Sequence, residues 1–126
     1  MTNAALALVD SGMDSLGLNY AFMHWAKQPD YPYFTGEYQE TESMTEDGLQ
    51  ESRFILNGWT RNSWLELEQA KEKVENYFNR ITGKQVITTN GSAVAVFYAN
   101  SLVIPTGDAE LKRIQINLLI KEWKVT

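Results

Sequence analysis

Cysteine is absent from the 126 residues and histidine occurs once. The chain can therefore form no disulfide bond and no thiolate metal site, and a single histidine excludes Cys–His nucleophiles and most zinc sites. No apolar run approaches the roughly 20 residues that span a bilayer, and the first residues lack the basic segment of a signal peptide. We expect a single domain, residues 1–126, made in the cytoplasm.

Motifs that indicate catalysis or nucleotide binding are also missing. The sequence has no G-x-x-x-x-G-K-[ST], no G-x-G-x-x-G and no G-x-S-x-G, so neither a phosphate-binding loop nor a nucleophile elbow is indicated. His24 has no acid four residues away on either side, and a structural role explains it best. Asn90-Gly-Ser92 is explained as a hairpin tip. We expect no enzyme activity, no cofactor and no bound metal.

Basic residues are scarce in the first half of the chain. Residues 1–52 carry nine acids against Lys27 alone, a balance of −8, whereas residues 53–126 carry ten bases against seven acids, a balance of +3. The first half repels phosphate groups, and the bases of the second half are not densely clustered. We therefore expect no sequence-specific nucleic acid binding and no membrane binding.

The segment 111–126 has the alternating pattern of a half-buried β-strand. Every second residue from Ile114 to Ile120 is apolar, with polar residues at most positions between them, so one face of the strand is apolar. The other elements can be arranged around this strand as hairpins and covering helices. Beyond Ile120 the apolar positions shift to Trp123 and Val125, which predicts a β-bulge or a strand that leaves the sheet.

The beginning of the chain has the periodicity of a helix. Its apolar stripe, which includes Tyr20, runs from residue 3 to about residue 26, with Thr2 or Asn3 as the N-cap. Gly12 and Gly17 are unfavourable inside a helix. Each predicts either a kink or a place where another backbone comes close.

A second helix is predicted from Trp64 to about residue 82. Ser63 and Glu66 have the spacing of a capping box, and Gly83 stands where a C-terminal cap belongs. The apolar stripe of this helix ends at Ile81. This pattern is the clearest 3.6-residue periodicity in the chain.

Five further segments are predicted as strands. They are residues 33–41, 50–61, 85–89, 93–99 and 102–104. The first two form a hairpin with a long acidic tip, and Asn90-Gly91 joins the next two as a second hairpin. The element order α-β-β-α-β-β-(β)-β predicts an α+β domain, in which a largely antiparallel sheet has two helices packed on one face.

Two kinds of residue are candidates for an interface. Carboxylates of the hairpin tip, at about residues 40–50, are expected to protrude because like charges repel one another. Converging carboxylates would also suit a divalent ion or acid–base chemistry, although an acidic loop is more often a solvated surface. Tryptophans are enriched at interfaces, and sealing the core edge is their alternative role. The candidates are Glu40, Glu42, Glu46, Asp47, Trp59, Trp64 and Trp123.

Several stretches of the sequence resemble a known family. They are Tyr33-Phe-Thr-Gly-Glu-Tyr38, Glu46-Asp-Gly48, Phe54-Ile-Leu-Asn-Gly-Trp-Thr-Arg61, Pro105-Thr-Gly-Asp108 and the closing LKRIQINLLIKEWKV. Together with chain length and element order, they make the sequence similar to the small tail-terminator and tail-completion proteins of long-tailed phages and of prophages in Gram-positive bacteria. The likeness spans most of residues 30–126.

This resemblance implies a structural protein of the virion tail, assembled in the cytoplasm of the bacterial host. Such subunits close into a ring, commonly a hexamer, at the head-proximal end of the tail tube. The ring stops tube polymerisation and joins the tube to head-completion proteins, without catalysis or a cofactor. An acidic tip facing the lumen or a partner ring would avoid holding the DNA that passes.

Two other functions are possible on the same residues. A small adaptor or immunity-like module would use the acidic hairpin to bind a basic partner. An enzyme with a carboxylate site would need acids that converge in a pocket, with at least one perturbed pKa. The spacing of the acids does not favour the enzyme.

Overall fold

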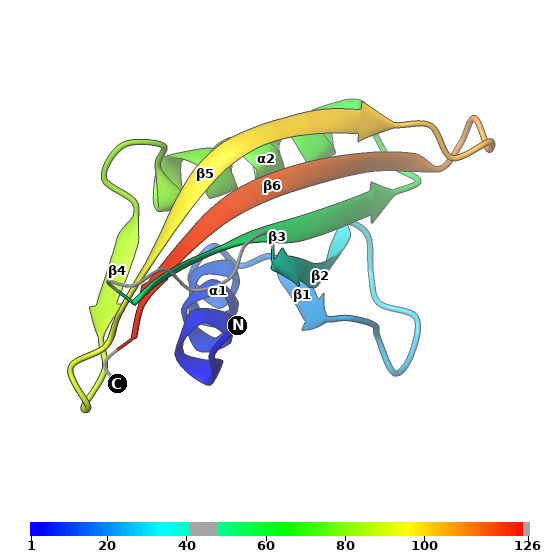
Figure 1. The fold of residues 1–126 in the computed structure, drawn as a ribbon. Coiled ribbons are helices and arrows are strands. Elements are labelled where there is room, and N and C mark those ends of the chain that lie inside the picture. Colours follow the sequence, from blue (N-terminus) through cyan, green and yellow to red (C-terminus); the bar gives the residue numbers. More distant parts are fainter. Residues whose placement is uncertain (41–47, 125–126) are drawn as a thin grey trace.

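A computed structural model of the chain describes residues 1–40 and 48–124. Its elements are α1 (Asn3–Ser15), β1 (Asn19–Phe22), β2 (Tyr33–Glu40), β3 (Leu49–Thr60), α2 (Trp64–Phe78), β4 (Lys84–Ile87), β5 (Ala93–Ile104) and β6 (Lys112–Trp123). The strands form one sheet in the order β1-β2-β3-β6-β5-β4, in which β1 and β2 are parallel and the other pairs antiparallel. The predicted α+β class is confirmed (Figure 1).

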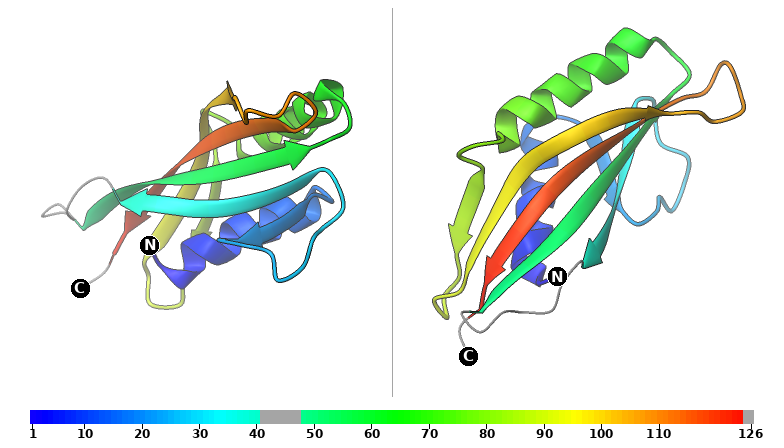
Figure 2. Two further views of the ribbon diagram at one scale, coloured as in Figure 1. Left: turned by 90° about the vertical axis from the view of Figure 1, so that its right-hand side faces the viewer. Right: turned by 45° about the horizontal axis from the view of Figure 1, so that its top comes forward.

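Both helices pack on the same face of the sheet. Alternate residues of the two central strands, among them Phe54, Leu56, Ile116 and Leu118, are fully buried in one core with apolar residues of α1 and α2. The sheet curls around α1, and α2 lies behind β5 and β6 (Figures 1 and 2). No helix of the described residues packs on the opposite face, which we call the uncovered face. None of the described helices is long and apolar enough to cross a membrane.

The last strand, β6, lies between β3 and β5, so the sheet is built around it. The change of phase predicted after Ile120 is wrong. Pairing with β3 continues in register until Trp123 lies opposite Leu49, and the inward position after Ile120 is taken by Glu122, which is fully buried. The bulge lies instead in β5, between Tyr98 and Asn100.

The first helix is shorter than predicted. It ends at Ser15, because Gly17 adopts a positive φ of 70° and the Leu18 N–H donates to the Met13 carbonyl at 3.1 Å. A left-handed glycine with such a reversed bond is a common way to end a helix. Tyr20 therefore belongs to β1 and not to the helix.

The caps at the helix N-termini are confirmed. The Thr2 side chain accepts from the Ala5 N–H in α1, and the Ser63 hydroxyl accepts from the Glu66 N–H at 3.3 Å in α2. The second half of the capping box is wrong, because the Glu66 carboxylate accepts from the Thr60 hydroxyl at 2.8 Å. The chain entering α2 is thereby fastened to the end of β3.

The C-terminus of α2 also differs from the prediction. The helix ends at Phe78, and Asn79 adopts a φ of 59°. The Asn79 side chain accepts from the N–H groups of Ile81 and Thr82 at 2.8 and 3.2 Å. Gly83 is therefore not the cap, and Ile81 is 85% exposed and lies outside the buried stripe.

Gly12 lies where α1 approaches α2. A Cβ atom at this position would lie 2.7 Å from Cζ of the Phe78 ring, which is far closer than a van der Waals contact. The predicted approach of another backbone is wrong at Gly12, because the nearest atoms belong to the side chains of Phe78 and Tyr77.

Both predicted hairpins are present. β2 and β3 pair from Tyr33–Trp59 to Glu40–Ser52, and residues 41–47 of the tip lie outside the described residues. β4 and β5 are joined by residues 88–92, a longer loop than the two-residue turn that Asn90-Gly91 indicates. The short strand predicted at 102–104 is the continuation of β5 beyond its bulge.

Candidate functional site

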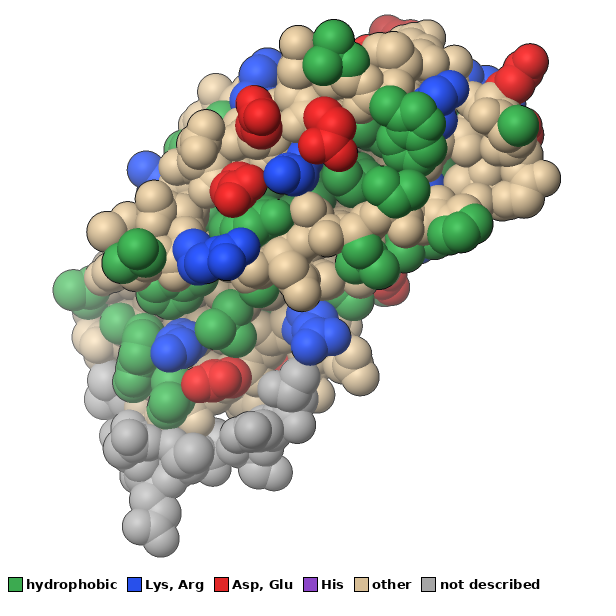
Figure 3. All heavy atoms as spheres, turned by 90° about the horizontal axis from the view of Figure 1, so that it is seen from above, with side chains coloured by type: hydrophobic (Ala, Val, Ile, Leu, Met, Phe, Trp, Pro, Cys, Tyr) green, Lys and Arg blue, Asp and Glu red, His purple; other side chains and the backbone are tan. Residues whose placement is uncertain are grey.

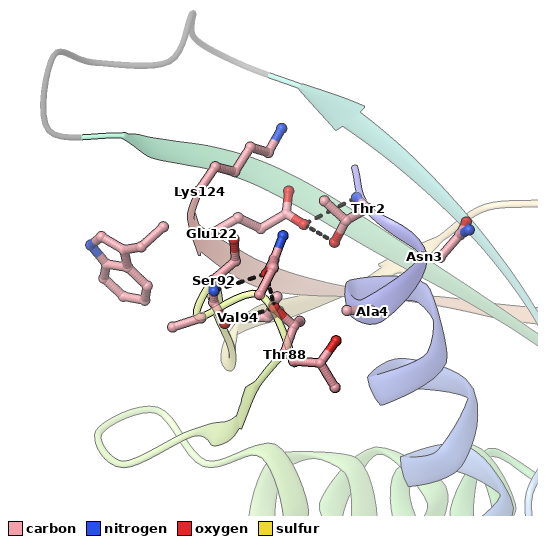
Figure 4. A pocket seen from close by; sticks show the side chains of 12 residues that line it. Thr2, Asn3, Ala4, Thr88, Ser92, Val94, Glu122 and Lys124 are labelled. Carbon is pink, nitrogen blue, oxygen red and sulfur yellow. Dashed lines mark hydrogen bonds between the residues drawn. The ribbon is translucent and has the colours of Figure 1, made fainter. Parts of the chain in front are cut away.

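A cavity of about 450 Å³ lies between the start of α1, the β4–β5 loop and the end of β6 (Figure 4). Glu122 lines it, and Figure 4 shows its carboxylate directed toward Thr2. Oε1 of Glu122 accepts from the Thr2 N–H at 3.0 Å and from the Thr2 hydroxyl, whereas Oε2 is buried and has no hydrogen-bond partner within residues 1–40 and 48–124. The start of a helix favours a negative charge, so Glu122 stabilises the N-terminus of α1.

The chemistry of this cavity is limited. Lys124 is the only other ionisable side chain among the described residues that line it, and the remaining lining is hydroxyl, amide and apolar. His24 lies elsewhere, beside Trp25 on the rim of a separate hollow. No three His, Asp or Glu side chains gather into a metal site within residues 1–40 and 48–124. The contacts of Glu122 describe a structural connection between β6 and α1.

Polar side chains on the uncovered face form hydrogen bonds between neighbouring strands, from β2 to β3, from β3 to β6 and from β6 to β5. Nη2 of Arg113 donates to Oδ1 of Asn57 at 2.8 Å, and Nδ2 of Asn57 donates to Glu37 at 3.1 Å. Further along, Nδ2 of Asn117 donates to Oδ1 of Asn100 at 2.8 Å. These bonds satisfy polar groups on a face that lacks a covering helix.

Trp59 belongs to an aromatic stack on the same face. Its ring lies 5.4 Å from that of Tyr33, centroid to centroid, and the Arg113 guanidinium carbon lies 5.4 Å from the Trp59 centroid. Tyr31 and Trp25 extend the stack over the β1–β2 connection. Because neighbours in its own chain cover Trp59, it reinforces the uncovered face more than it offers a free docking surface.

Trp64 is more exposed than Trp59. It is 42% exposed at the start of α2 and lines a hollow of about 340 Å³ with Val103 and Pro105. Leu65 and Leu102 are exposed next to them in the sequence. We call the exposed apolar residues Trp64, Leu65, Leu102 and Val103 the β5-end patch, in which Leu102 lies on the opposite face of β5 from Val103. Figure 3 shows hydrophobic side chains at the surface over this end of β5 and α2, among acids and bases.

The remaining predicted residues lie at the other end of the sheet. Trp123 is 38% exposed and stands opposite Ala93, which in turn stands opposite Ile87 in the edge strand β4. Glu40, at the exposed end of β2, forms an ion pair with the amino group of Met1. The hydrogen bond from that amino group lowers the pKa of Glu40.

The structure therefore does not gather the predicted interface residues into one site. Trp59 and Trp123 lie near opposite ends of the β3–β6 ladder, ten ladder positions apart, which is about 33 Å along a strand. Glu42, Glu46 and Asp47 lie outside the described residues. Among the described residues, the predicted interface candidates therefore lie on separate surfaces.

One exposed apolar group was not predicted. Phe22 and Met23, at the end of β1, are 40% and 58% exposed, and Phe22 stacks on Tyr38 at 6.2 Å. Both residues were assigned to the first helix. Gly17 was the signal that could have placed them in a separate strand.

Comparisons with known proteins support the fold but identify no function. Neither a protein-family profile nor a curated sequence matches the chain. Seven chains of solved structures match. One of them, which has no functional name, aligns with a TM-score of 0.67 and 16% sequence identity. The alignment covers 98% of this chain and 94% of the matched chain. At this identity the match shows a shared architecture over the whole chain and no shared activity.

Proposed function

We propose that the protein is a structural subunit of a phage or prophage tail, a tail-terminator or tail-completion protein whose copies form a ring at the head-proximal end of the tail tube. The resemblance of its sequence suggests this function. The structural observation that supports self-assembly is that large apolar side chains are exposed in separate groups. A ring built from head-to-tail contacts needs two different surfaces on every subunit.

Three such groups lie on different parts of the described structure. They are the β5-end patch, the pair Phe22 and Met23 beside β1, and the pair Ile87 and Trp123 at the β4 end of the sheet. Exposed apolar groups are common at surfaces that a partner covers. Two groups suffice for the two neighbours in a ring, and the third is available to the tail tube or to a head-completion protein.

This function depends on the shape and the assembly of the subunit and requires no chemical reaction. The ring would form in the bacterial cytoplasm and become part of the virion tail, with no catalytic group and no cofactor. The carboxylates Glu40, Glu42, Glu46 and Asp47 would face the lumen or a partner ring, where negative charge repels the phosphates of passing DNA.

Light scattering after size exclusion, across a wide concentration series, tests the self-assembly. We expect the mass to rise to one limiting species and negative-stain images to show rings of uniform diameter. Added to purified tail tubes, the protein should bind one end and stop elongation. A monomer at every concentration that also leaves tube elongation unchanged contradicts the proposal.

A second experiment tests the place of the acidic tip. Replacing Glu40, Glu42, Glu46 and Asp47 with Lys should leave the fold intact but make rings retain DNA in a salt-dependent manner. Replacing Glu68 and Glu72, exposed acids of α2, is the matched control. Unchanged assembly together with unchanged DNA retention contradicts a tip that faces the lumen or a partner ring.

The alternative function is an acidic adaptor or immunity-like module. The observation in its favour is that Glu37 and Glu40 are exposed on the part of β2 that extends beyond β1. This function predicts a monomer or dimer that binds a basic partner rapidly at low salt. The same light-scattering series separates the two functions.

A further inference from the structure

Two edges of the sheet have no neighbouring strand among the described residues. β4 pairs only with residues 93–96 of β5, so the edge of residues 99–104, beyond the bulge, is unpaired. On the opposite side the sheet ends with β1. Unpaired N–H and C=O groups on a sheet edge are a template for pairing with another strand.

These two edges also lack protective charges. Residues 99–104 are Ala, Asn, Ser, Leu, Val and Ile, and residues 19–22 are Asn, Tyr, Ala and Phe. In contrast, the unpaired part of β2 carries Glu37 and Glu40, and the edge strand β4 begins with Lys84. Charged residues on an edge oppose the pairing of copies. Charge therefore protects some edges of this sheet and leaves residues 99–104 and 19–22 open.

Exposed apolar side chains accompany both open edges. Leu102 and Val103 are 44% and 53% exposed on opposite faces of β5, and Trp64 lines a hollow together with Val103. The end of β1 carries Phe22, and Met23 follows it. Side chains of this kind add affinity to a ladder of backbone hydrogen bonds.

Near the open part of β5, the cation of Arg80 accompanies the mixed charges of α2, whereas α1 beside β1 carries only acids. The Arg80 guanidinium lies over the ring of Tyr98 at 5.5 Å, just before the open part of β5. Lys71, also close to Tyr98, is already paired with Glu75 at 3.4 Å. Beside β1, α1 exposes Asp10 and Asp14 and contains no Lys or Arg. Burial raises the pKa of the Tyr20 hydroxyl, and the negative charge of Asp10 raises it further.

We infer that residues 99–104 of β5 receive β1 of a second copy of the chain, so that neighbouring subunits share one continuous sheet. The contact brings Arg80 of one copy toward Asp10 of the next. It is heterologous, because a different edge of each copy takes part, and such contacts close into a ring or continue as a filament. The ring geometry, though not the edge pairing, rests on the proposed function.

The strength of the contact follows from its size. β1 is four residues long, so the shared ladder is short in comparison with a standard interface of about 1,200–2,000 Å². A single contact should therefore be weak. Closure of a ring adds a final contact within the same assembly, where the effective concentration is high. We expect few intermediates between the monomer and the complete assembly.

Three variants test the assignment. The β5-edge variant carries Leu102→Lys and Val103→Lys, the β1-edge variant carries Phe22→Lys and Met23→Lys, and the control carries Ile81→Lys, at a residue that is 85% exposed and belongs to neither edge. Circular dichroism and urea unfolding establish that each variant is folded. Each edge variant alone should remain monomeric at concentrations where the wild type and the control assemble.

Mixing the two edge variants is the decisive measurement. Each copy still has one intact edge, so the mixture should form a 1:1 heterodimer and nothing larger, at protein concentrations above those at which the wild type assembles, because only one contact holds the heterodimer together. A symmetric contact predicts no such heterodimer. Charge reversal is an independent check: Arg80→Asp and Asp10→Lys should each weaken assembly at least tenfold, and the double variant should recover most of the loss.

The outcomes separate this inference from the proposed function. Rings that persist in both edge variants overturn the edge assignment and leave the tail function standing. Edge-dependent filaments support the assignment and count against the ring. A wild type that does not associate at any concentration overturns the inference and the ring together.

Discussion

Glu122, near the end of the last strand, accepts a hydrogen bond at 3.0 Å from the backbone N–H of Thr2, which lies 120 positions earlier in the chain. Thr2 in turn caps α1 by accepting from the Ala5 N–H at 3.3 Å. The start of the first helix is thus fastened to the last strand, and a buried carboxylate supplies the acceptor.

Removing this carboxylate should destabilise the fold. Glu122→Ala leaves the N–H and hydroxyl of Thr2 without their acceptor, so we expect the free energy of unfolding to fall by about 2–4 kcal/mol. Glu122→Gln should cost less, because the amide oxygen still accepts. Urea unfolding measures both, with Glu110→Ala, an exposed acid, as the control. Equal losses for Ala and Gln contradict a role as hydrogen-bond acceptor.

Thr2 and Glu122 should be energetically coupled. Thr2→Ala alone should cost about 1 kcal/mol, as the loss of an N-cap usually does. In the double variant with Glu122→Ala the total should fall short of the sum of the single losses, because each single change already breaks the Thr2 hydroxyl bond. A double-mutant cycle by urea unfolding measures this coupling, and strict additivity would argue against it.

Gly12→Ala should destabilise the protein although alanine favours helices. The gain in helix propensity is about 1 kcal/mol, but the new Cβ would lie 2.7 Å from the Phe78 ring. Overpacking of this kind costs about 1–3 kcal/mol, so we expect a lower melting temperature. Ser11→Ala, at the exposed neighbouring position, should be neutral or slightly stabilising. A stabilised Gly12→Ala variant would show that Phe78 moves aside.

Asn79 should tolerate glycine better than alanine. Its φ of 59° is unfavourable for residues with a Cβ, and its side chain accepts from two backbone N–H groups at the end of α2. Asn79→Ala loses the hydrogen bonds and keeps the strain, whereas Asn79→Gly relieves the strain. We expect losses of about 1–3 kcal/mol for Ala and less for Gly, from thermal unfolding. The reverse order would contradict this account.

The carboxyl group of Asp108 should titrate below the ordinary value of about 3.9. The Glu110 N–H donates to it at 3.0 Å and Arg61 at 3.1 Å, and both hydrogen bonds lower its pKa, the backbone bond first. A depressed pKa stabilises the fold at pH values above the ordinary pKa, and the contribution disappears as the pH falls through the pKa of the folded state.

NMR titration of the Asp108 carboxyl carbon measures this effect. Arg61→Gln should raise the pKa of Asp108 but leave it below the ordinary value, because the backbone hydrogen bond remains. Lys73→Gln, at an exposed position on α2, should leave the titration unchanged. A pKa of Asp108 that does not respond to Arg61→Gln would show that the ion pair does not persist in solution.

Local signals in the sequence predicted much of the fold. Ser63 caps α2, and Ile114 to Ile120 alternate as a strand of the sheet, because neighbours in the sequence determine both features. The end of α1 was also encoded locally, in Gly17, although the apolar period continuing to Tyr20 concealed it. The position of the candidate interface residues depends on tertiary structure. Trp64 is exposed beside Val103, but their proximity depends on how α2 packs against β5.

The α+β class, the N-caps of both helices and the alternation of the central strand follow from the sequence, because these features depend on residues within a few positions of one another. Tertiary structure alone decided that Glu122 points inward, since its donors on Thr2 come from the opposite end of the chain. It also decided that Trp59 is covered by Tyr33 and that no strand of the described residues pairs with the outer edge of residues 99–104. Both depend on which strands become neighbours, and strand order arises only when the whole core is buried.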